Sequence, residues 1–251
     1  RSREVHIGLV GKYVKLHDAY LSVAEAMNHA GYELNTFVKI HWIDSENIRS
    51  DNVKDILEGL DGIIVPGGFG NRGIEGMILS ANYARENQIP YFGICLGMQI
   101  AVIEFARNVL GLKDAHSGEF DEQCEYKVID FMPGQSERKD KGGTLRLGSY
   151  PCSIKAGTKM EQCYGGKLIH ERHRHRYEFN NKYREELIGA GLVISGTSPD
   201  ERLVESVELK EHPFFVGVQF HPEFKSRPNQ SHPLFKGFVS AALKESKRKE
   251  E

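Results

Sequence analysis

Short apolar runs alternate with amphipathic stretches along the first 111 residues of the chain. Four of the runs have the length and composition of strands in a buried sheet: residues 5–11, 36–43, 62–68 and 90–94. The stretches between them place apolar side chains at helical spacing: residues 20–31, 53–60, 74–88 and 97–111. Strands separated by helices of this length form right-handed βαβ units. The pattern therefore predicts an α/β fold whose central sheet is mostly parallel and flanked by helices.

The pattern changes after Gly111, where the apolar runs become shorter. Four strand-like runs follow: residues 125–132, 143–154, 192–198 and 202–209. They predict an additional small region of antiparallel strands. A further strand at 214–223 and a helix from Pro233, which fades into a charged tail, complete the pattern. Because no repeat and no linker interrupts the chain, we expect residues 1–251 to form a single domain.

The composition is that of an ordinary globular protein. The chain has 251 residues, of which 39% are hydrophobic and 27% are charged, so it can bury a sizeable core. A formal net charge of −2 gives no electrostatic attraction for nucleic acid or an anionic membrane, and we expect neither as a partner. No apolar run approaches the roughly 18 residues that span a bilayer, which predicts a soluble protein.

The four cysteines, Cys95, Cys124, Cys152 and Cys163, form no C-x-x-C pair and no dense framework. Free thiols of this kind are typical of a reducing compartment, so we expect a cytoplasmic protein. The chain begins with Arg rather than Met, and its first strand starts within a few residues. We therefore expect it to be a domain of a longer protein.

Cys95 stands between Gly93 and Gly97, where the strand at 90–94 gives way to a helix. The motif G-x-C-x-G matches the tight strand-to-helix turn G-x-S-x-G, which presents a nucleophile above a sheet. Glycine is needed two residues to either side because larger side chains would collide there. The following helix N-terminus favours an anion and lowers the pKa of a thiol. A buried core cysteine beside a helix start is the alternative, and this motif alone leaves both open.

A second motif lies near the other end of the chain, where His221 and Glu223 flank Pro222 after an apolar run. A histidine and a carboxylate in this position offer a general base and a group that holds its tautomer. A histidine cap with a solvated glutamate is the alternative. Both motifs follow predicted strands of one α/β chain, and this combination favours a Cys–His–Glu triad.

The glycine-rich stretch VPGGFGNRG, residues 65–73, follows another buried strand. Glycines there could cradle a phosphate or form an oxyanion hole. The phosphate-binding sequence G-x-x-x-x-G-K-[ST] is absent from the whole chain. If the stretch instead forms an oxyanion hole, the backbone amides of Gly67, Gly68 and Leu96 would face a tetrahedral carbon bonded to Cys95.

These motifs, P-G-G-F-G, G-x-C-x-G-x-Q and Q-F-H-P-E in that order, resemble those of the class I (triad-type) glutamine amidotransferases. The resemblance extends over essentially the whole chain and implies the flavodoxin-like α/β fold of that family. It is most specific toward the glutaminase domains of the CTP synthase family, because the stretches GGTLRLG and ERHRHRYEFN accompany the three motifs.

The resemblance implies a role for each residue of the triad. Cys95 would attack the side-chain amide of glutamine and release ammonia through a thioester, His221 would transfer protons, and Glu223 would orient His221. It also implies glutamine or oxyanion contacts at nine further positions: Gly67, Gly68, Phe69, Leu96, Gly97, Met98, Gln99, Glu119 and Arg176. Charge supports the last two, since the α-ammonium of glutamine requires a carboxylate and its α-carboxylate a guanidinium. Gly118, beside Glu119, departs from the residue that other members carry.

The same resemblance implies partners outside this chain. The domain itself would need no cofactor. ATP, UTP and Mg²⁺ would bind an N-terminal synthetase domain that is absent from this chain, and the intact protein would be a homo-oligomer, a tetramer. GTP would activate glutamine hydrolysis allosterically, and the polar segment 134–148 would be a lid that closes over the cleft only with GTP and the synthetase domain present.

Other functions remain open at this point. A γ-glutamyl hydrolase or a cysteine peptidase could use the same scaffold, and a binding module could keep the fold without activity. The intact triad argues against a binding module, and Glu119 with Arg176 favours a free amino acid over a peptide. His170, His173 and His175 also suggest a metal site, but no Cys or Asp accompanies them at ligand spacing. We interpret these histidines instead as part of a packed segment on the substrate side of the domain.

Overall fold

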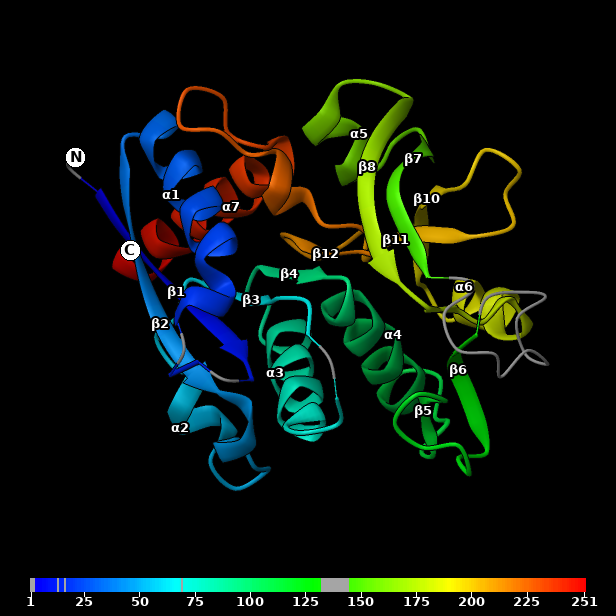
Figure 1. Ribbon diagram of the computed structural model, residues 1–251. Coiled ribbons are helices and arrows are strands. Elements are labelled where there is room, and N and C mark those ends of the chain that lie inside the picture. The colour runs from blue at the N-terminus through cyan, green and yellow to red at the C-terminus, as the bar shows by residue number, and fades with distance from the viewer. Residues whose placement is uncertain (1–2, 13, 16, 69, 132–144) are drawn as a thin grey trace.

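The computed structural model describes most of the chain, in five stretches: residues 3–12, 14–15, 17–68, 70–131 and 145–251. Phe69 and most of the expected lid, residues 134–144, lie outside the described residues. A mixed sheet of nine strands runs through the described part of the molecule (Figure 1). No helix in that part of the chain is long and apolar enough to cross a membrane.

One half of the sheet is parallel. In order across the sheet, this half contains β2 (Thr36–Asp44), β1 (Arg3–Gly11), β3 (Gly62–Val65), β4 (Tyr91–Ile94) and β12 (Phe215–Val218). Strands β3, β4 and β12 are buried along their whole length, which explains why their sequences are continuous apolar runs rather than alternating ones. Because these three strands are parallel, their carboxyl ends meet at one edge of the sheet.

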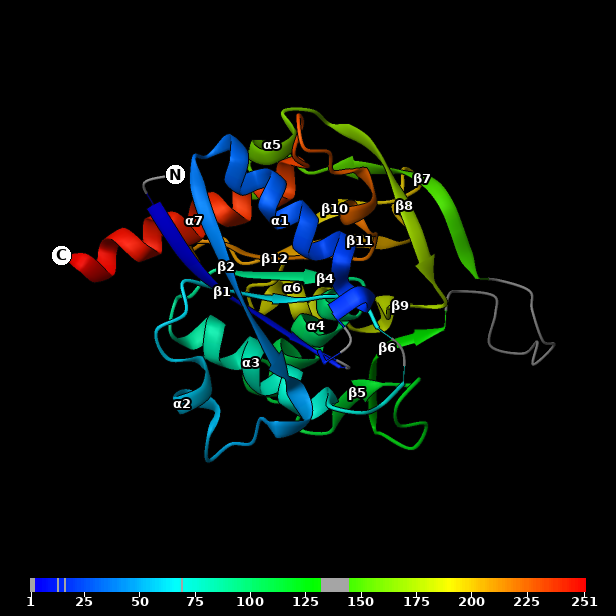
Figure 2. The same cartoon turned by 60° about the vertical axis from the view of Figure 1, so that its left-hand side comes forward.

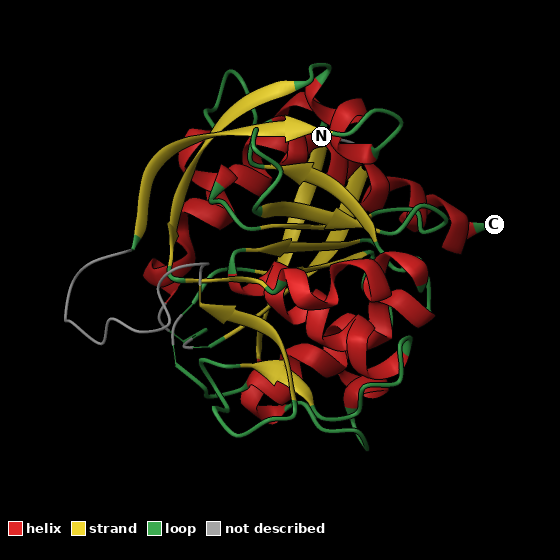
Figure 3. Ribbon diagram, turned by 90° about the vertical axis from the view of Figure 1, so that its right-hand side faces the viewer, coloured by secondary structure: helices red, strands yellow, loops and turns green. Residues whose placement is uncertain are grey.

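The other half of the sheet is antiparallel and continues directly from β12. It contains β11 (Val204–Glu208), β10 (Val193–Thr197), β7 (Arg146–Ile154) and β8 (Leu168–His175). Figure 3 shows the twist of the strands and the helices around them. The predicted α/β fold is confirmed, and its antiparallel region extends the central sheet.

Helices cover both faces of the parallel half (Figures 1 and 2). On one face, α1 (Leu21–Glu33) packs against α7 (Pro233–Glu250) over a cluster of buried aromatic and aliphatic side chains. On the other face, α2 (Val53–Leu57), α3 (Ile74–Glu86) and α4 (Leu96–Asn108) pack over a second apolar cluster. Helix α4 is the most deeply buried of these, with eleven residues buried from Leu96 to Ala106.

Most of the remaining short elements were not predicted; the exception is the strand expected at 125–132, which is confirmed as Tyr126–Phe131. A separate three-stranded sheet contains β5 (Ala115–Ser117), β6 (Tyr126–Phe131) and β9 (Tyr177–Phe179). Two short helices, α5 (Lys159–Tyr164) and α6 (Arg184–Gly189), lie between the antiparallel strands in sequence. Four 3₁₀ turns complete the described elements: His17–Tyr20, Ser45–Asn47, Asn181–Tyr183 and Pro222–Lys225.

The charged C-terminal residues are the last turns of helix α7. Helix α7 continues to Glu250, and Glu245 within it is buried. Lys249 Nζ donates hydrogen bonds to the Leu60 carbonyl oxygen (2.6 Å) and to Asp61 Oδ1 (3.2 Å). These contacts tie the last turn of the helix to the residues just before β3, while residues 247–251 are exposed, as expected of a charged tail.

Candidate active site

Cys95 occupies a strained turn between β4 and α4. Its backbone has φ 52° and ψ −101°, a conformation that side-chain-bearing residues rarely adopt. A Cβ at Gly93 would lie 2.4 Å from the Gly97 carbonyl oxygen, and a Cβ at Gly97 would lie 2.0 Å from the Val65 carbonyl oxygen. Both glycines are therefore required by close backbone approach, as the sequence predicted.

The neighbouring strand fixes the position of Cys95. Its backbone amide donates a hydrogen bond to the Val218 carbonyl oxygen (2.7 Å), at the carboxyl end of β12. Cys95 is also the N-cap residue of α4, so its side chain lies at the positive end of a helix of 13 residues. Cys95 is 8% exposed and lines a cavity, which leaves it reachable from that cavity but largely buried.

His221 and Glu223 follow β12 and therefore lie beside Cys95. The pairing of β12 with β4 places Val218 opposite Ile94, so residues shortly after the two strand ends are brought together. His221 Nδ1 and Glu223 Oε1 are 2.7 Å apart, and both side chains are mostly buried. The backbone amide of His221 donates to the Arg172 carbonyl oxygen (2.8 Å), which anchors the turn to β8.

The imidazole of His221 is held in its charged form. Burial lowers its pKa, but hydrogen bonds and charges from Cys95 and Glu223 outweigh burial and raise the pKa of His221 to about 10. An imidazolium next to a thiol favours the thiolate, which is the nucleophilic form of cysteine. A cysteine beside an imidazole that a carboxylate holds is an arrangement suited to attack on a carbonyl carbon.

The glycine-rich stretch after β3 packs directly against the triad. A Cβ at Gly67 would lie 2.8 Å from His221 Cε1 and 3.5 Å from the Cβ of Cys95. A Cβ at Gly68 would lie 3.7 Å from Leu96 Cδ2, and both residues line the cavity. Leu96 begins α4, and the first amides of a helix have no acceptor within it. The donors expected to form an oxyanion hole are thus gathered around Cys95.

A cavity of about 430 Å³ opens above the sulfur. Ten residues line it: Gly68, Cys95, Leu96, Gln99, Glu119, Leu145, Arg174, His175, Arg176 and Tyr177. Five of the nine predicted substrate positions are therefore in its wall. Gly97 and Met98 do not line the cavity: Gly97 packs on Val65, and Met98 packs on Gly217. Gly67 contacts the triad without lining the cavity.

Opposite charges face each other at the mouth of this cavity. Burial raises the pKa of Glu119, while the nearby charges of Lys12 and Arg176 oppose that effect. Burial lowers the pKa of Lys12 to about 8, and the charge of Glu119 opposes it. Lys12 also donates a hydrogen bond to the Gly70 carbonyl oxygen. Lys12 was not predicted as a site residue, although it stands in the stretch GLVGKY directly after the first strand.

Two histidines of β8, His173 and His175, belong to a buried cluster of charged side chains, whereas His170 is exposed. His173 Nε2 lies 3.2 Å from Glu205 Oε2, and His175 Nδ1 lies 3.3 Å from Glu178 Oε1. Arg146 forms ion pairs with both glutamates. Burial, and next the charge of Arg146, lowers the pKa of His173 to about 2 and that of His175 to about 3. Among the described residues no group of His, Cys, Asp and Glu could hold a metal.

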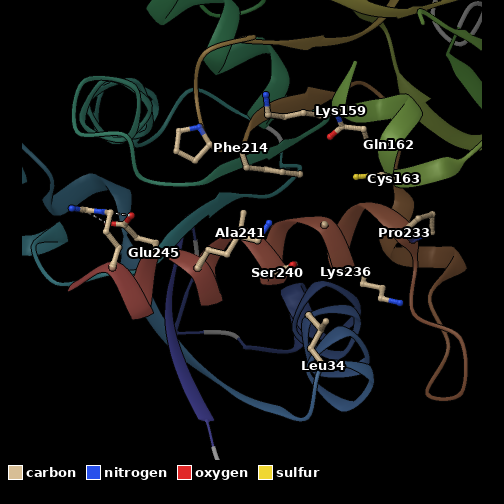
Figure 4. A pocket seen from close by; sticks show the side chains of 14 residues that line it. Leu34, Lys159, Gln162, Cys163, Phe214, Pro233, Lys236, Ser240, Ala241 and Glu245 are labelled. Carbon is tan, nitrogen blue, oxygen red and sulfur yellow. Dashed lines mark hydrogen bonds and ion pairs between the residues drawn. The ribbon is translucent and has the colours of Figure 1, made fainter. Parts of the chain in front are cut away.

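A larger cavity, about 790 Å³, lies elsewhere, along α7 (Figure 4). Its thiol, Cys163, is half-buried, and burial raises its pKa to about 11. The residues that line it include lysines, Phe214 and Glu245 but no histidine. Among the residues that the structure describes, the cavity therefore has no imidazole beside its thiol, in contrast to the cavity at Cys95.

A thiol at a strand-to-helix turn, with an imidazole that a carboxylate holds, is the arrangement of a thiol-dependent acyl-transfer enzyme. The chain belongs to the glutamine amidotransferase class-I family, whose family model matches residues 15–241.

The most similar proteins found among curated sequences include CTP synthases. The CTP synthase of Carboxydothermus hydrogenoformans is 63% identical over 244 residues, which cover 97% of this chain and 46% of that protein. The CTP synthase of Bacillus subtilis is 57% identical over 248 residues, 99% of this chain and 46% of that protein. The chain thus spans about half the length of the curated relatives it matches.

Among solved structures, the glutaminase domain of Trypanosoma brucei CTPS with bound acivicin is 42% identical and superposes with a TM-score of 0.90. The match covers 96% of this chain and 94% of that domain. A GMP synthase subunit from Thermoplasma acidophilum, at 17% identity and a TM-score of 0.62, shares the fold.

Proposed function

We propose that this chain hydrolyses L-glutamine to glutamate and ammonia, with Cys95, His221 and Glu223 as its catalytic triad. The observation that carries the proposal is the triad geometry itself: a thiol at the N-terminus of α4 beside an imidazolium whose Nδ1 lies 2.7 Å from a carboxylate oxygen. The 42% identical glutaminase domain, which superposes with a TM-score of 0.90, supports the assignment of glutamine as substrate.

The reaction follows from these contacts in two halves. The Cys95 thiolate attacks the side-chain carboxamide carbon of glutamine, and amides near Gly68 and Leu96 stabilise the resulting oxyanion. His221 gives its proton to the leaving nitrogen, and the C–N bond breaks to release ammonia and leave a thioester. His221 then takes a proton from water, which attacks the thioester and releases glutamate and the thiolate. Glu223 keeps the imidazole oriented through both halves.

Selection of a free amino acid rests on the two charged residues at the cavity mouth. Glu119 fits the α-ammonium of glutamine, and the guanidinium of Arg176 fits its α-carboxylate. Both residues line the cavity that contains Cys95. A peptide substrate would leave one or both charges without a partner, so a γ-glutamyl hydrolase or a cysteine peptidase suits the site less well.

The proposal extends to the protein that would contain this chain. The curated CTP synthases are about twice as long as the matched region, so we propose that residues 1–251 form the glutaminase domain of a CTP synthase. A synthetase domain would use the ammonia to aminate UTP with ATP and Mg²⁺, GTP would activate the glutaminase through the segment 134–148, and the enzyme would be a cytoplasmic homotetramer. These assignments rest on the similarity to CTP synthases.

One assay tests the proposed reaction. The chain is incubated with L-glutamine or with a γ-glutamyl dipeptide, and glutamate release is measured for each. We expect glutamine to have the higher kcat/KM, and we expect Cys95→Ser to abolish the activity. Faster turnover of the dipeptide would instead identify a γ-glutamyl hydrolase.

A further inference from the structure

Gln219 is a fully buried polar residue at the end of β12, two positions before His221. Its neighbours in the chain, Val218 and Phe220, are apolar and equally buried. The backbone amide of Gln219 donates to the Glu205 carbonyl oxygen (2.8 Å), which continues the pairing of β12 with β11 and fixes the backbone. A buried amide costs free energy unless its groups are paired, so the partners of this side chain explain its presence.

The side chain of Gln219 connects the nucleophile to α4. Its Nε2 lies 3.5 Å from Cys95 Sγ and donates a hydrogen bond to it. Its Oε1 accepts a hydrogen bond from Gln99 Nε2 (3.2 Å). Gln99 Nε2 also donates to the Tyr177 carbonyl oxygen (3.1 Å), next to Arg176.

This chain of contacts fixes which way both amides point. A backbone carbonyl oxygen only accepts hydrogen bonds, so the Gln99 atom that faces Tyr177 must be the nitrogen. The same nitrogen faces Gln219, whose facing atom must then be the oxygen. The Gln219 nitrogen is consequently left on the side of the sulfur, where it donates.

We infer that Gln219 is a further catalytic residue: its side-chain amide stabilises the Cys95 thiolate, and Gln99 holds that amide in the donating orientation. A hydrogen bond to a charged acceptor in a dry site favours the charged form. The thiolate is then stabilised by the His221 imidazolium, the Gln219 amide and the N-terminus of α4, whereas the Arg174 carbonyl oxygen, 3.9 Å from the sulfur, favours the thiol. The inference rests on the proposed function, because it matters only where Cys95 is the nucleophile.

The substitution Gln219→Met tests this role. Methionine has nearly the same length and volume but no N–H group, so the strand end stays filled while the donor is lost. Gln99 keeps the Tyr177 carbonyl as a partner. We expect the midpoint of Cys95 ionisation to rise by about 1 pH unit, which corresponds to about 1.4 kcal/mol. We expect kcat for glutamine to fall about tenfold and KM to change less than about twofold, because the lost contact is with the sulfur.

The midpoint is measured from the pH dependence of the rate at which iodoacetamide alkylates Cys95, followed by mass spectrometry of the Cys95 peptide. Gln162→Met, an exposed position on α5, is the matched control and should leave the midpoint unchanged. Gln99→Met is a second variant, and we expect a smaller rise of the same sign because the Gln219 amide loses its fixed orientation.

The possible outcomes separate this inference from the proposed function. If wild-type alkylation does not map to Cys95, the nucleophile assignment itself fails. If it maps to Cys95 and both variants keep the wild-type midpoint to within about 0.3 pH units, the nucleophile stands and the role of Gln219 is refuted. A lower melting temperature with an unchanged midpoint would likewise show that Gln219 has only a structural role.

Discussion

The close packing of Gly67 against His221, the proposed catalytic histidine, makes Gly67→Ala a sharp test of the site geometry. A Cβ at this position would lie 2.8 Å from His221 Cε1, whereas carbon atoms in contact are ordinarily at least about 3.4 Å apart. The ring or the loop must therefore move by about 0.6 Å. The ring has little freedom, because Nδ1 lies 2.7 Å from Glu223 Oε1. A retreat of that size directly away from Glu223 would lengthen this contact to about 3.3 Å and weaken the hydrogen bond.

Two effects of the substitution can be estimated. Overpacking of a well-packed site costs about 1–3 kcal/mol of stability. Misplacement of a catalytic group by about 1 Å lowers the rate about 10²-fold, so a movement of about half that size should lower kcat by about tenfold or more. If the loop moves instead of the ring, the oxyanion donors are displaced and the rate falls as well.

The assay is steady-state glutaminase activity of Gly67→Ala, with urea unfolding to confirm that the variant is folded. Gly189→Ala serves as the control, because a Cβ at Gly189 meets nothing within 4 Å and its φ is not positive. We expect the control to retain its activity. Retention of more than half of the wild-type kcat/KM by folded Gly67→Ala would refute the packing of the loop against His221.

Three further predictions concern the triad and its surroundings. Glu223→Gln should lower kcat less than His221→Ala, since the carboxylate orients the imidazole without taking its proton; steady-state kinetics showing the reverse order would mean that the roles are misassigned. Arg146→Met should lower the free energy of unfolding, measured in urea, by about 3–5 kcal/mol, because two buried glutamates lose their counter-ion. Arg49→Met removes an exposed ion pair and should leave the midpoint of urea unfolding unchanged. The raised pKa of His221, about 10, contributes stability that is fully present below pH 6.5 and is lost as the pH rises toward 10. Unfolding curves of His221→Gln should therefore vary less over that range than those of the wild type, and an equal dependence would argue against a charged His221.

Much of the parallel half of the fold could be predicted, for a physical reason. Strands β3, β4 and β12 are buried on both faces and read as unbroken apolar runs. The adjacency of β4 and β12 could not be read from periodicity, since their residues are more than 100 positions apart in the chain. The motifs G-x-C-x-G and H-P-E each follow the end of a strand, and this shared position indicated that they would meet.

In the antiparallel half, β7, β10 and β11 lie within predicted strands, but β8 was not predicted because charge hides its pattern. Strand β8 alternates buried His173 and His175 with exposed Arg172 and Arg174, so it has the period of a strand without an apolar face. Its inward histidines are accommodated by ionic partners on other strands, which no local pattern reveals. Gln219 was overlooked for a similar reason, although it is the first residue of the motif Q-F-H-P-E.

The most direct test of the central claim is covalent labelling of the protein with an electrophilic glutamine analogue, followed by mass spectrometry of the peptides. We expect the label on Cys95 alone, and protection by L-glutamine. Cys152 and Cys163 should be spared, because burial raises their pKa to about 12 and about 11 and neither lines the cavity above Cys95. Labelling of another cysteine, or equal labelling of a Cys95→Ser variant, would contradict the assignment of Cys95 as the nucleophile.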